Sequence, residues 1–176
     1  MIRQEEMFEK PVRPDDIVYT PDDVAGEIVR WLKPNGSCLD PCKGDGAFFR
    51  HLPDGAEWCE VREGRDFFDW TTPVDWIIGN PPYSMFEEFL QHSFALATNV
   101  VYIVPTNKVF QRQLIMEMIT AWGGIRAMMV YGSGTVVGFP FGFSVGTFHF
   151  QKGYKGECNL ILGNKNRPTF QMSNCA

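Results

Sequence analysis

The feature that most constrains this chain is an apolar strand that ends in two prolines. Residues 74–79 have the length and composition of a buried strand, and Asn80-Pro81-Pro82-Tyr83 follows directly. Because neither proline has an N–H to donate to a sheet, the strand must stop there. Each proline also holds the residue before it in an extended conformation. The result is a stiff tetrapeptide that presents one carboxamide and one aromatic ring at fixed positions.

This tetrapeptide carries the groups that can hold an exocyclic amine. The side-chain oxygen of Asn80 and the backbone carbonyl of Pro81 can accept both amine hydrogens, and the ring of Tyr83 can stack on the attached base. The alternative is a strand that ends in a proline turn without any further role. The rest of the chain has to decide between these two interpretations.

The composition is that of one globular domain. With 176 residues the chain can bury a sizeable core, and 44% hydrophobic and 21% charged residues are ordinary values. A net charge of −5 is not typical of nucleic-acid-binding domains, although local basic patches can compensate. Five cysteines without CxxC spacing and three scattered histidines indicate reduced thiols and no metal site. Without a signal peptide or a long apolar run, we expect a cytoplasmic protein with no membrane partner.

Strands and helices alternate, which predicts an α/β fold with a mostly parallel sheet. Thr20 and Pro21 predict a helix start, with Thr20 as the N-cap, and this helix extends to Leu32. Further helices are expected after residue 48, at 85–97 and at 109–122. Strands are expected at residues 37–40, 57–61, 74–79, 99–104, 125–131 and 144–151, and a short one at 159–162.

A glycine-containing loop at residues 40–46 lies between a strand and a helix, where nucleotide cofactors bind. Two carboxylates, Asp40 and Asp45, disfavour a pyrophosphate there and favour a cationic ligand, such as an ammonium or sulfonium group. Glu60 at the end of the next strand suits ribose hydroxyls. A solvated charge at a strand end explains Glu60 equally well.

Several segments, in their order along the chain, resemble those of the class I S-adenosylmethionine-dependent methyltransferases of the adenine-N6 group. The resemblance follows the gamma-type DNA enzymes and spans about residues 17–151 of the chain. The matching segments are Tyr19-Thr20-Pro21, residues 40–48, Asp66-Phe67-Phe68, Asn80-Pro81-Pro82-Tyr83 and Phe139-Pro140-Phe141. The resemblance implies a Rossmann-like sheet with an antiparallel last strand, S-adenosylmethionine as cofactor, no metal, and methyl transfer to adenine N6, in DNA rather than RNA.

The resemblance also implies roles for individual residues. The cofactor would contact Thr20, Asp40, Pro41, Gly44, Asp45, Gly46, Glu60, Asp66, Phe67 and Asn80. Thr20 would hold its carboxylate, Asp40 its ammonium group and Glu60 its ribose. Asp66 would accept from the adenine amine, and Phe67 would pack on the adenine ring.

The catalytic set would be Asn80, Pro81, Pro82 and Tyr83. Tyr83 and Phe139 would enclose a target base that has left its stack, with Phe141 an equal alternative to Phe139. Lys108 follows a strand end and would meet a phosphate, unless it is an ordinary solvated helix charge. Phe148 and Phe150 share a strand face and are expected in the core.

Two features depart from this family. Only six positions separate Glu60 from Asp66, which leaves no room for the usual helix and strand, so we expect about six strands. No target-recognition domain follows residue 151: we expect a 1–18 arm, a 19–151 catalytic core and a 152–176 tail. This tail is basic, because Glu157 is its one acidic residue. Its basic residues are Lys152, Lys155, Lys165 and Arg167. We therefore expect relaxed sequence specificity, or recognition through a homodimer or a separate specificity subunit.

Other functions share the tetrapeptide. An adenine or guanine amine of RNA is the second candidate, followed by a protein glutamine, which methyltransferases with the same Asn-Pro-Pro-Tyr also modify. A non-catalytic module that binds S-adenosylmethionine is a further alternative. The preferred interpretation is a bacterial or phage-encoded DNA adenine methyltransferase, of the kind found in restriction–modification.

Overall fold

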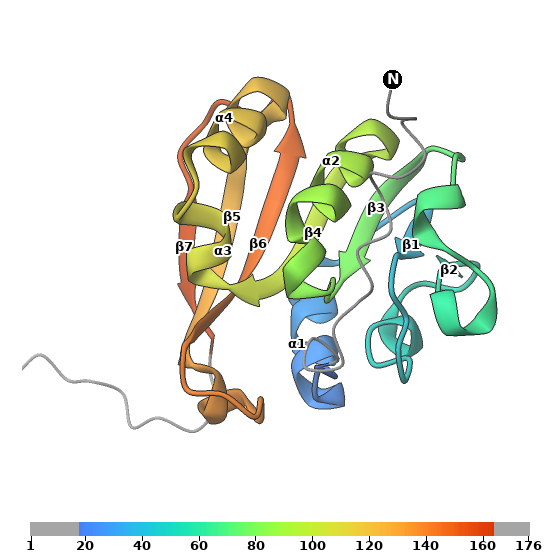
Figure 1. Ribbon diagram of the computed structural model, residues 1–176, viewed down its shortest axis with the longest axis horizontal. Helices are drawn as coiled ribbons and strands as arrows, with labels where there is room; N and C mark the ends of the chain where they lie inside the picture. Colours follow the sequence, from blue (N-terminus) through green and yellow to red (C-terminus); the bar gives the residue numbers. More distant parts are fainter. Residues whose placement is uncertain (1–17, 164–176) are drawn as a thin grey trace, which may run out of the picture.

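The computed structural model describes residues 18–163, which form one seven-stranded sheet with helices on both faces (Figure 1). The strand order is β2-β1-β3-β4-β6-β5-β7. The strands are β1 (Cys38–Asp40), β2 (Glu57–Trp58), β3 (Val74–Gly79), β4 (Ala97–Pro105), β5 (Gly123–Ser133), β6 (Ser144–Lys152) and β7 (Asn159–Leu162). Strands β2, β1, β3 and β4 are parallel, and β6 runs antiparallel to both β4 and β5.

The expected α/β fold is confirmed, but the expectation of about six strands is wrong. The short strand β7 joins the main sheet as a parallel neighbour of β5, and this makes seven strands. At the other edge, the chain passes from β2 to β3 through two short 3₁₀ turns, η4 (Val61–Glu63) and η5 (Phe67–Asp69). The missing helix and strand between Glu60 and Asp66 therefore leave β2 as the edge strand.

The α-helices are α1 (Asp22–Leu32), α2 (Phe86–Leu96), α3 (Thr106–Phe110) and α4 (Gln113–Trp122). Helices α2, α3 and α4 cover one face of the sheet, and α1 packs on the other (Figure 1). The segment after the glycine loop forms only a 3₁₀ turn, η3 (Phe49–His51), where a helix was expected. None of the helices in the described range is long and apolar enough to cross a membrane.

The helix expected at residues 109–122 is two helices instead, because its buried positions do not lie on one helical face. Val109 and Ile115 are both buried, yet six residues apart they would point in different directions on a straight helix. Arg112 adopts an extended conformation that reorients the chain, and its guanidinium pairs with Glu87 on α2. Tertiary contacts thus override the local helical pattern.

Phe148 and Phe150 lie in the core, as expected. Both are fully buried, and their rings stack with centroids 6.2 Å apart beneath α2, α3 and α4. A second cluster on the opposite face joins α1 to β3 and β4, with Ile28, Ile78 and Ile103 fully buried.

Replacing Phe150 with alanine is expected to lower the free energy of unfolding by about 3–5 kcal/mol, because a fully buried ring leaves a cavity behind. Urea denaturation followed by circular dichroism measures this change. Val61→Ala is the matched control, since Val61 is exposed and its truncation should change stability by less than about 0.5 kcal/mol. Equal midpoints for the two variants would contradict the assignment of Phe150 to the core.

Candidate active site at the ends of β1 and β3

Two predicted motifs meet at one edge of the sheet. Strands β1 and β3 are parallel neighbours, with Leu39 opposite Ile77, so their carboxyl ends lie side by side. The glycine loop follows β1, and the tetrapeptide that begins at Asn80 follows β3. The Cys42 thiol joins them by donating to the Asn80 carbonyl over 3.1 Å.

Gly79 allows this close approach. A Cβ at this position would lie 2.9 Å from Cδ of Pro41, which is closer than real Cβ atoms are found, and 3.1 Å from Oδ1 of Asp40, which is a tight contact. The loop can therefore rest on the end of β3 only because β3 ends in glycine. Beyond it, Pro81 is buried, and the Pro82 carbonyl accepts the Met85 amide at 3.0 Å. That bond starts the 3₁₀ turn η6 (Tyr83–Met85), which leads into α2.

The glycine loop is held by hydrogen bonds to residues 59 and 60, which directly follow β2. Gly44 and Gly46 have φ values of +57° and +88°, a region that favours glycine. The Lys43 amide donates to the Cys59 carbonyl, and the Gly44 amide donates to the Glu60 carboxylate at 2.9 Å. The loop is thus already shaped in the ligand-free protein.

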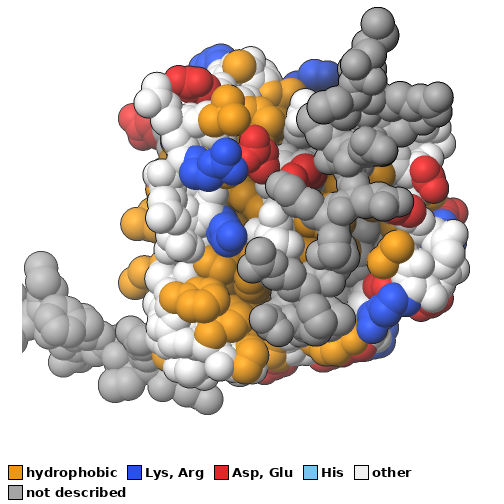
Figure 2. Space-filling model, viewed as in Figure 1, with side chains coloured by type: hydrophobic (Ala, Val, Ile, Leu, Met, Phe, Trp, Pro, Cys, Tyr) orange, Lys and Arg blue, Asp and Glu red, His pale blue; other side chains and the backbone are white. Residues whose placement is uncertain are grey.

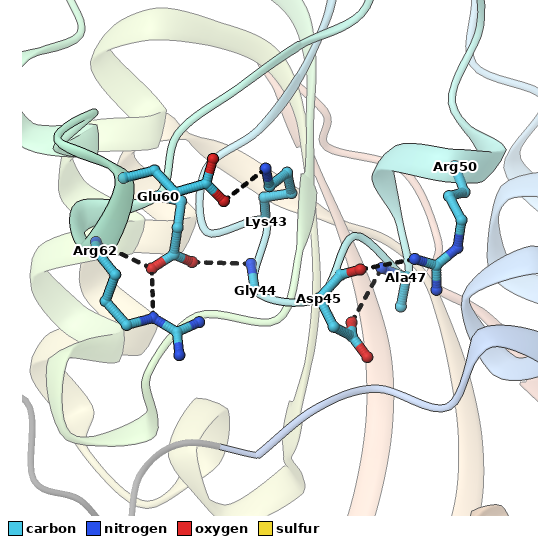
Figure 3. Close-up of polar contacts among 8 residues, drawn as sticks. Lys43, Gly44, Asp45, Ala47, Arg50, Glu60 and Arg62 are labelled. Atoms are coloured by element: carbon cyan, nitrogen blue, oxygen red, sulfur yellow. Dashed lines mark hydrogen bonds and ion pairs between the residues drawn. The ribbon is translucent and has the colours of Figure 1, made fainter.

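Glu60 is engaged in holding this loop. Its carboxylate accepts from the Gly44 amide and from the backbone and side chain of Arg62 (Figure 3). Burial by itself would raise the pKa of Glu60, but the hydrogen bonds from Arg62 and Gly44 outweigh burial and leave it below its ordinary value. Asp45 is turned away from Glu60 and accepts from the Ala47 amide at 3.2 Å.

Three buried side-chain oxygens at this edge have no hydrogen-bond partner among the described residues: Thr20 Oγ1, Asp40 Oδ2 and Asn80 Oδ1. Such orphaned groups are rare in folded proteins, because desolvating a polar atom without a partner costs free energy. All three oxygens belong to residues that the sequence assigns to one ligand site. Their lack of partners therefore indicates that this site binds a polar ligand. These atoms offer a hydroxyl, a carboxyl oxygen and an amide oxygen.

Thr20 is available because it does not cap the helix, contrary to the sequence prediction. Pro21 occupies the N-cap position, and its carbonyl accepts the amides of Val24 and Ala25. Without a bond from Thr20 to the helix amides, its buried hydroxyl is left for another partner.

The orientation of the Asn80 carboxamide is determined by its neighbour. Its Nδ2 donates to the carbonyl of Val18 at 2.8 Å, and a carbonyl can only accept. The opposite atom of the amide must therefore be the oxygen, Oδ1, which is the acceptor that an amine requires. Val18 was not identified from the sequence, since a backbone carbonyl leaves no signal in residue type.

Asp40 is almost completely buried, at 1% exposure. Burial raises its pKa to about 7, and the hydrogen bond from the Cys42 amide offsets only part of this effect. The nearby carboxylate of Glu60 raises the pKa further. A buried carboxyl of this kind is stabilised in its ionised form by a cation.

The two aromatic candidates lie differently with respect to Tyr83. Tyr83 is buried and meets Phe141 edge to face, with ring centroids 6.0 Å apart. Phe139 is buried, stacks on Phe141 at 5.3 Å, and belongs to the core cluster under α1. Phe141, and not Phe139, is therefore the ring that contacts Tyr83.

Phe67 and Asp66 are placed differently from the positions that the resemblance implies. The Phe67 ring is 3% exposed and stacks on Phe89 of α2 at 5.1 Å, so its face is occupied by core. The exposed carboxylate of Asp66 accepts from the Phe68 amide at 2.9 Å and caps a 3₁₀ turn. Both displacements follow from the short connection after β2, which draws this segment onto α2.

Tyr19 also contacts the glycine loop, although the sequence assigned it no role. Its ring lies over the loop, because a Cβ on Gly44 would be 3.2 Å from it, and its hydroxyl accepts from Arg62 at 3.0 Å. The feature of the sequence that could have identified Tyr19 is its position directly before Thr20.

Lys108 lies at the same edge of the sheet as the tetrapeptide. It lines a groove of about 340 Å³ together with Tyr83, Glu87, Gln111 and other side chains of α2, α3 and α4. Figure 2 shows basic and acidic side chains next to each other on this face. No group of three or more potential metal ligands occurs in the described part of the chain.

Comparisons with known proteins agree with this architecture. A scan against protein-family models and a search of the curated proteins found no significant match. Among solved structures, a Listeria monocytogenes protein described as a class I S-adenosylmethionine-dependent methyltransferase has 16% identity and a TM-score of 0.65, covering 87% of this chain and 68% of that one. A Pyrococcus horikoshii protein described as an RNA methyltransferase has 15% identity and a TM-score of 0.54, covering 74% and 82%.

The M protein of the type I restriction enzyme EcoKI is also similar, with 12% identity and a TM-score of 0.55 over 76% of this chain and 44% of that one. At such identities the comparisons establish the fold alone. It is the fold of the class I S-adenosylmethionine-dependent methyltransferases.

Proposed function

We propose that this protein is an S-adenosylmethionine-dependent methyltransferase that modifies an exocyclic amine of a nucleobase, with adenine N6 in DNA as the preferred substrate. One observation carries the proposal. The amide oxygen of Asn80 is buried, oriented by Val18 and without a partner among the described residues, and it lies beside a loop with a buried carboxyl suited to a cation.

The residues present fit the cofactor. The Thr20 hydroxyl can donate to the carboxylate of its amino-acid part, and the free oxygen of Asp40 can accept from its ammonium group. The positive φ values of Gly44 and Gly46 shape the loop, and Glu60 keeps it in place and would accept from the ribose hydroxyls. The cofactor supplies an electrophilic methyl group on a sulfonium.

The chain contributes position and electrostatics to the reaction. The adenine amine is a poor nucleophile because its lone pair is delocalised into the ring. Acceptors at Asn80 Oδ1 and the Pro81 carbonyl favour a more tetrahedral nitrogen whose lone pair points at the methyl carbon. The N–C bond would form as the S–C bond breaks, and the extra proton would then leave the nitrogen for water.

The target base would have to leave its stack to reach Asn80. Tyr83 and Phe141 offer aromatic rings beside that position, and Lys108 in the adjoining groove offers a positive charge to a phosphate. Of the basic residues expected in the tail, Lys155 donates to the backbone carbonyls of Thr120 and Gly123, whereas Lys165 and Arg167 lie outside the described residues.

The choice of DNA rests on the gamma-type order of motifs and is supported by the likeness to the EcoKI M protein. An RNA amine is the second candidate, which the likeness to the Pyrococcus horikoshii protein favours. Relaxed sequence specificity, or a separate specificity subunit, is part of the proposal.

A labelled-methyl assay on duplex DNA, single-stranded DNA, ribosomal RNA and protein tests the proposal. We expect label in adenine N6 of DNA. Label in RNA alone would establish the second candidate, and label in protein would exclude a nucleobase. If S-adenosylhomocysteine binds in calorimetry but no polymer is labelled, the chain is a non-catalytic module. Modification of only one long DNA sequence would contradict relaxed specificity.

A further inference from the structure

The strand β7 leaves the sheet with an unusual outer edge. Within residues 18–163 its only neighbour is β5, so its other side is not paired. Leu160 and Leu162 are 61% and 79% exposed, and residues 158–163 carry no charge. Edge strands are normally short, charged or covered, because a bare apolar edge recruits other chains.

The opposite edge of the sheet is protected in the usual ways. Strand β2 has only two residues, and Glu57 on it forms an ion pair with Arg65 at 2.9 Å. The cation of Arg65 also lies over the ring of Trp58. Of the two edge strands, β7 is therefore the one that we expect another chain to cover.

The backbone of β7 shows which groups are available. The Gly163 amide donates to the Val130 carbonyl of β5 at 3.0 Å, so the polar groups of Gly163 point toward the sheet. These groups alternate in direction along a strand, so those of Ile161 also point toward β5. The N–H and C=O groups of Leu160 and Leu162 therefore point outward.

The exposed leucines continue an apolar face of the protein. Leu160 is opposite Met128 on β5, which is opposite Phe148 on β6, and opposite residues share a face. The ring of Phe110 on α3 packs against Phe148 on that face, and Phe110 is still 48% exposed. Figure 2 shows hydrophobic side chains along the edge where Figure 1 places β7.

We propose that β7 is a homodimer interface, at which a second copy of this chain adds its own β7 in antiparallel orientation. A two-fold axis through Ile161 places Leu160 opposite Leu162 of the second copy. This register pairs residues that share a face and joins the outward N–H and C=O groups in four hydrogen bonds. The four leucines then form one cluster. The contact is isologous, so the dimer is closed and no bare edge remains.

This dimer is independent of methyl transfer. Strands β1 and β3, which carry the candidate site, are separated from β7 by β4, β6 and β5, so both sites stay open. The paired segment is short and the exposed side chains beside it are few, so the affinity should be on the order of micromolar, as for small interfaces.

Sedimentation velocity from about 1 to about 100 µM, the range in which such interfaces dissociate, tests the proposal. The wild type should shift from monomer to dimer, and Leu160→Lys/Leu162→Lys should stay monomeric because like charges would face each other. Leu160→Lys/Leu162→Glu should restore the dimer, since opposite charges then pair across the axis. Val61→Lys adds a charge to an equally exposed site elsewhere and should behave as wild type.

Circular dichroism and S-adenosylhomocysteine binding show whether the variants keep their fold. A wild type that is monomeric at every concentration, or a folded Leu160→Lys/Leu162→Lys variant that dimerises like wild type, would overturn the proposal.

Cross-linking tests the register directly, in a background with Cys158→Ser and Cys175→Ser. Ile161→Cys should form a disulfide-linked dimer under mild oxidation, because residues opposite each other in a pair without hydrogen bonds have Cα atoms about 4.5 Å apart. Leu160→Cys alone should not cross-link, whereas Leu160→Cys/Leu162→Cys should. Efficient linkage through Leu160→Cys alone would overturn the register centred on Ile161.

Discussion

Asn80→Ala is expected to reduce kcat by about 10²–10³-fold, the usual loss when one preorganised polar contact to the transition state is removed. In the proposed reaction the orphaned Oδ1 accepts from the amine and favours its nucleophilic geometry, and alanine has no such atom. Single-turnover rates with labelled cofactor on the best polymer measure the change.

The fold should survive this substitution, because the side chain makes one hydrogen bond, to the Val18 carbonyl. Binding of S-adenosylhomocysteine should change by less than the rate does. Asn35→Ala is a control at an exposed amide after α1, and it should leave the rate unchanged. A wild-type rate for Asn80→Ala would refute the assignment of Asn80 to the reaction.

Asp40→Asn is expected to weaken S-adenosylhomocysteine binding by about 10- to 100-fold, since a hydrogen bond to a charged group contributes about 1.5–3 kcal/mol. The affinity of the wild type for S-adenosylhomocysteine should also depend on pH. The pKa of Asp40 is raised from 3.8 to about 7, and an ammonium group binds the ionised form. Affinity should therefore rise with pH through about 7 and level off above it, with binding at pH 6 about tenfold weaker than at the plateau.

The stability of the ligand-free protein should change in the opposite sense. Since the folded protein keeps the Asp40 proton up to about pH 7, and the unfolded chain loses it near pH 3.8, the contribution of this group to stability falls as pH rises between these values. Bound cofactor should compensate at higher pH. Calorimetry in buffers of different ionisation enthalpy measures the proton released on binding.

Two controls separate Asp40 from other titrating groups. Asp40→Asn should bind with an affinity that does not vary with pH across this range. Methylthioadenosine, which lacks the amino-acid part and so the ammonium group, should also bind the wild type without this dependence. A wild-type affinity for S-adenosylhomocysteine that is flat between about pH 6 and pH 8 would contradict the assignment.

The sequence by itself determined the features that follow from local chemistry. The end of β3 at Gly79 could be predicted because prolines lack an N–H, and the positions of Phe148 and Phe150 because alternation in a strand is strict. The meeting of the glycine loop with Asn80 could also be predicted, since parallel strands bring their carboxyl ends to one edge.

Only the tertiary structure decided which side chains are left for a ligand. Thr20 is available because Pro21 is the N-cap, and Phe67 is lost to the core because the chain after β2 lies on α2. Phe141 rather than Phe139 meets Tyr83, although both have the same side chain and lie two positions apart. The physical reason is common to all three. A residue's type states what it can bind, whereas the distant segments packed around it determine which of its atoms remain unpaired.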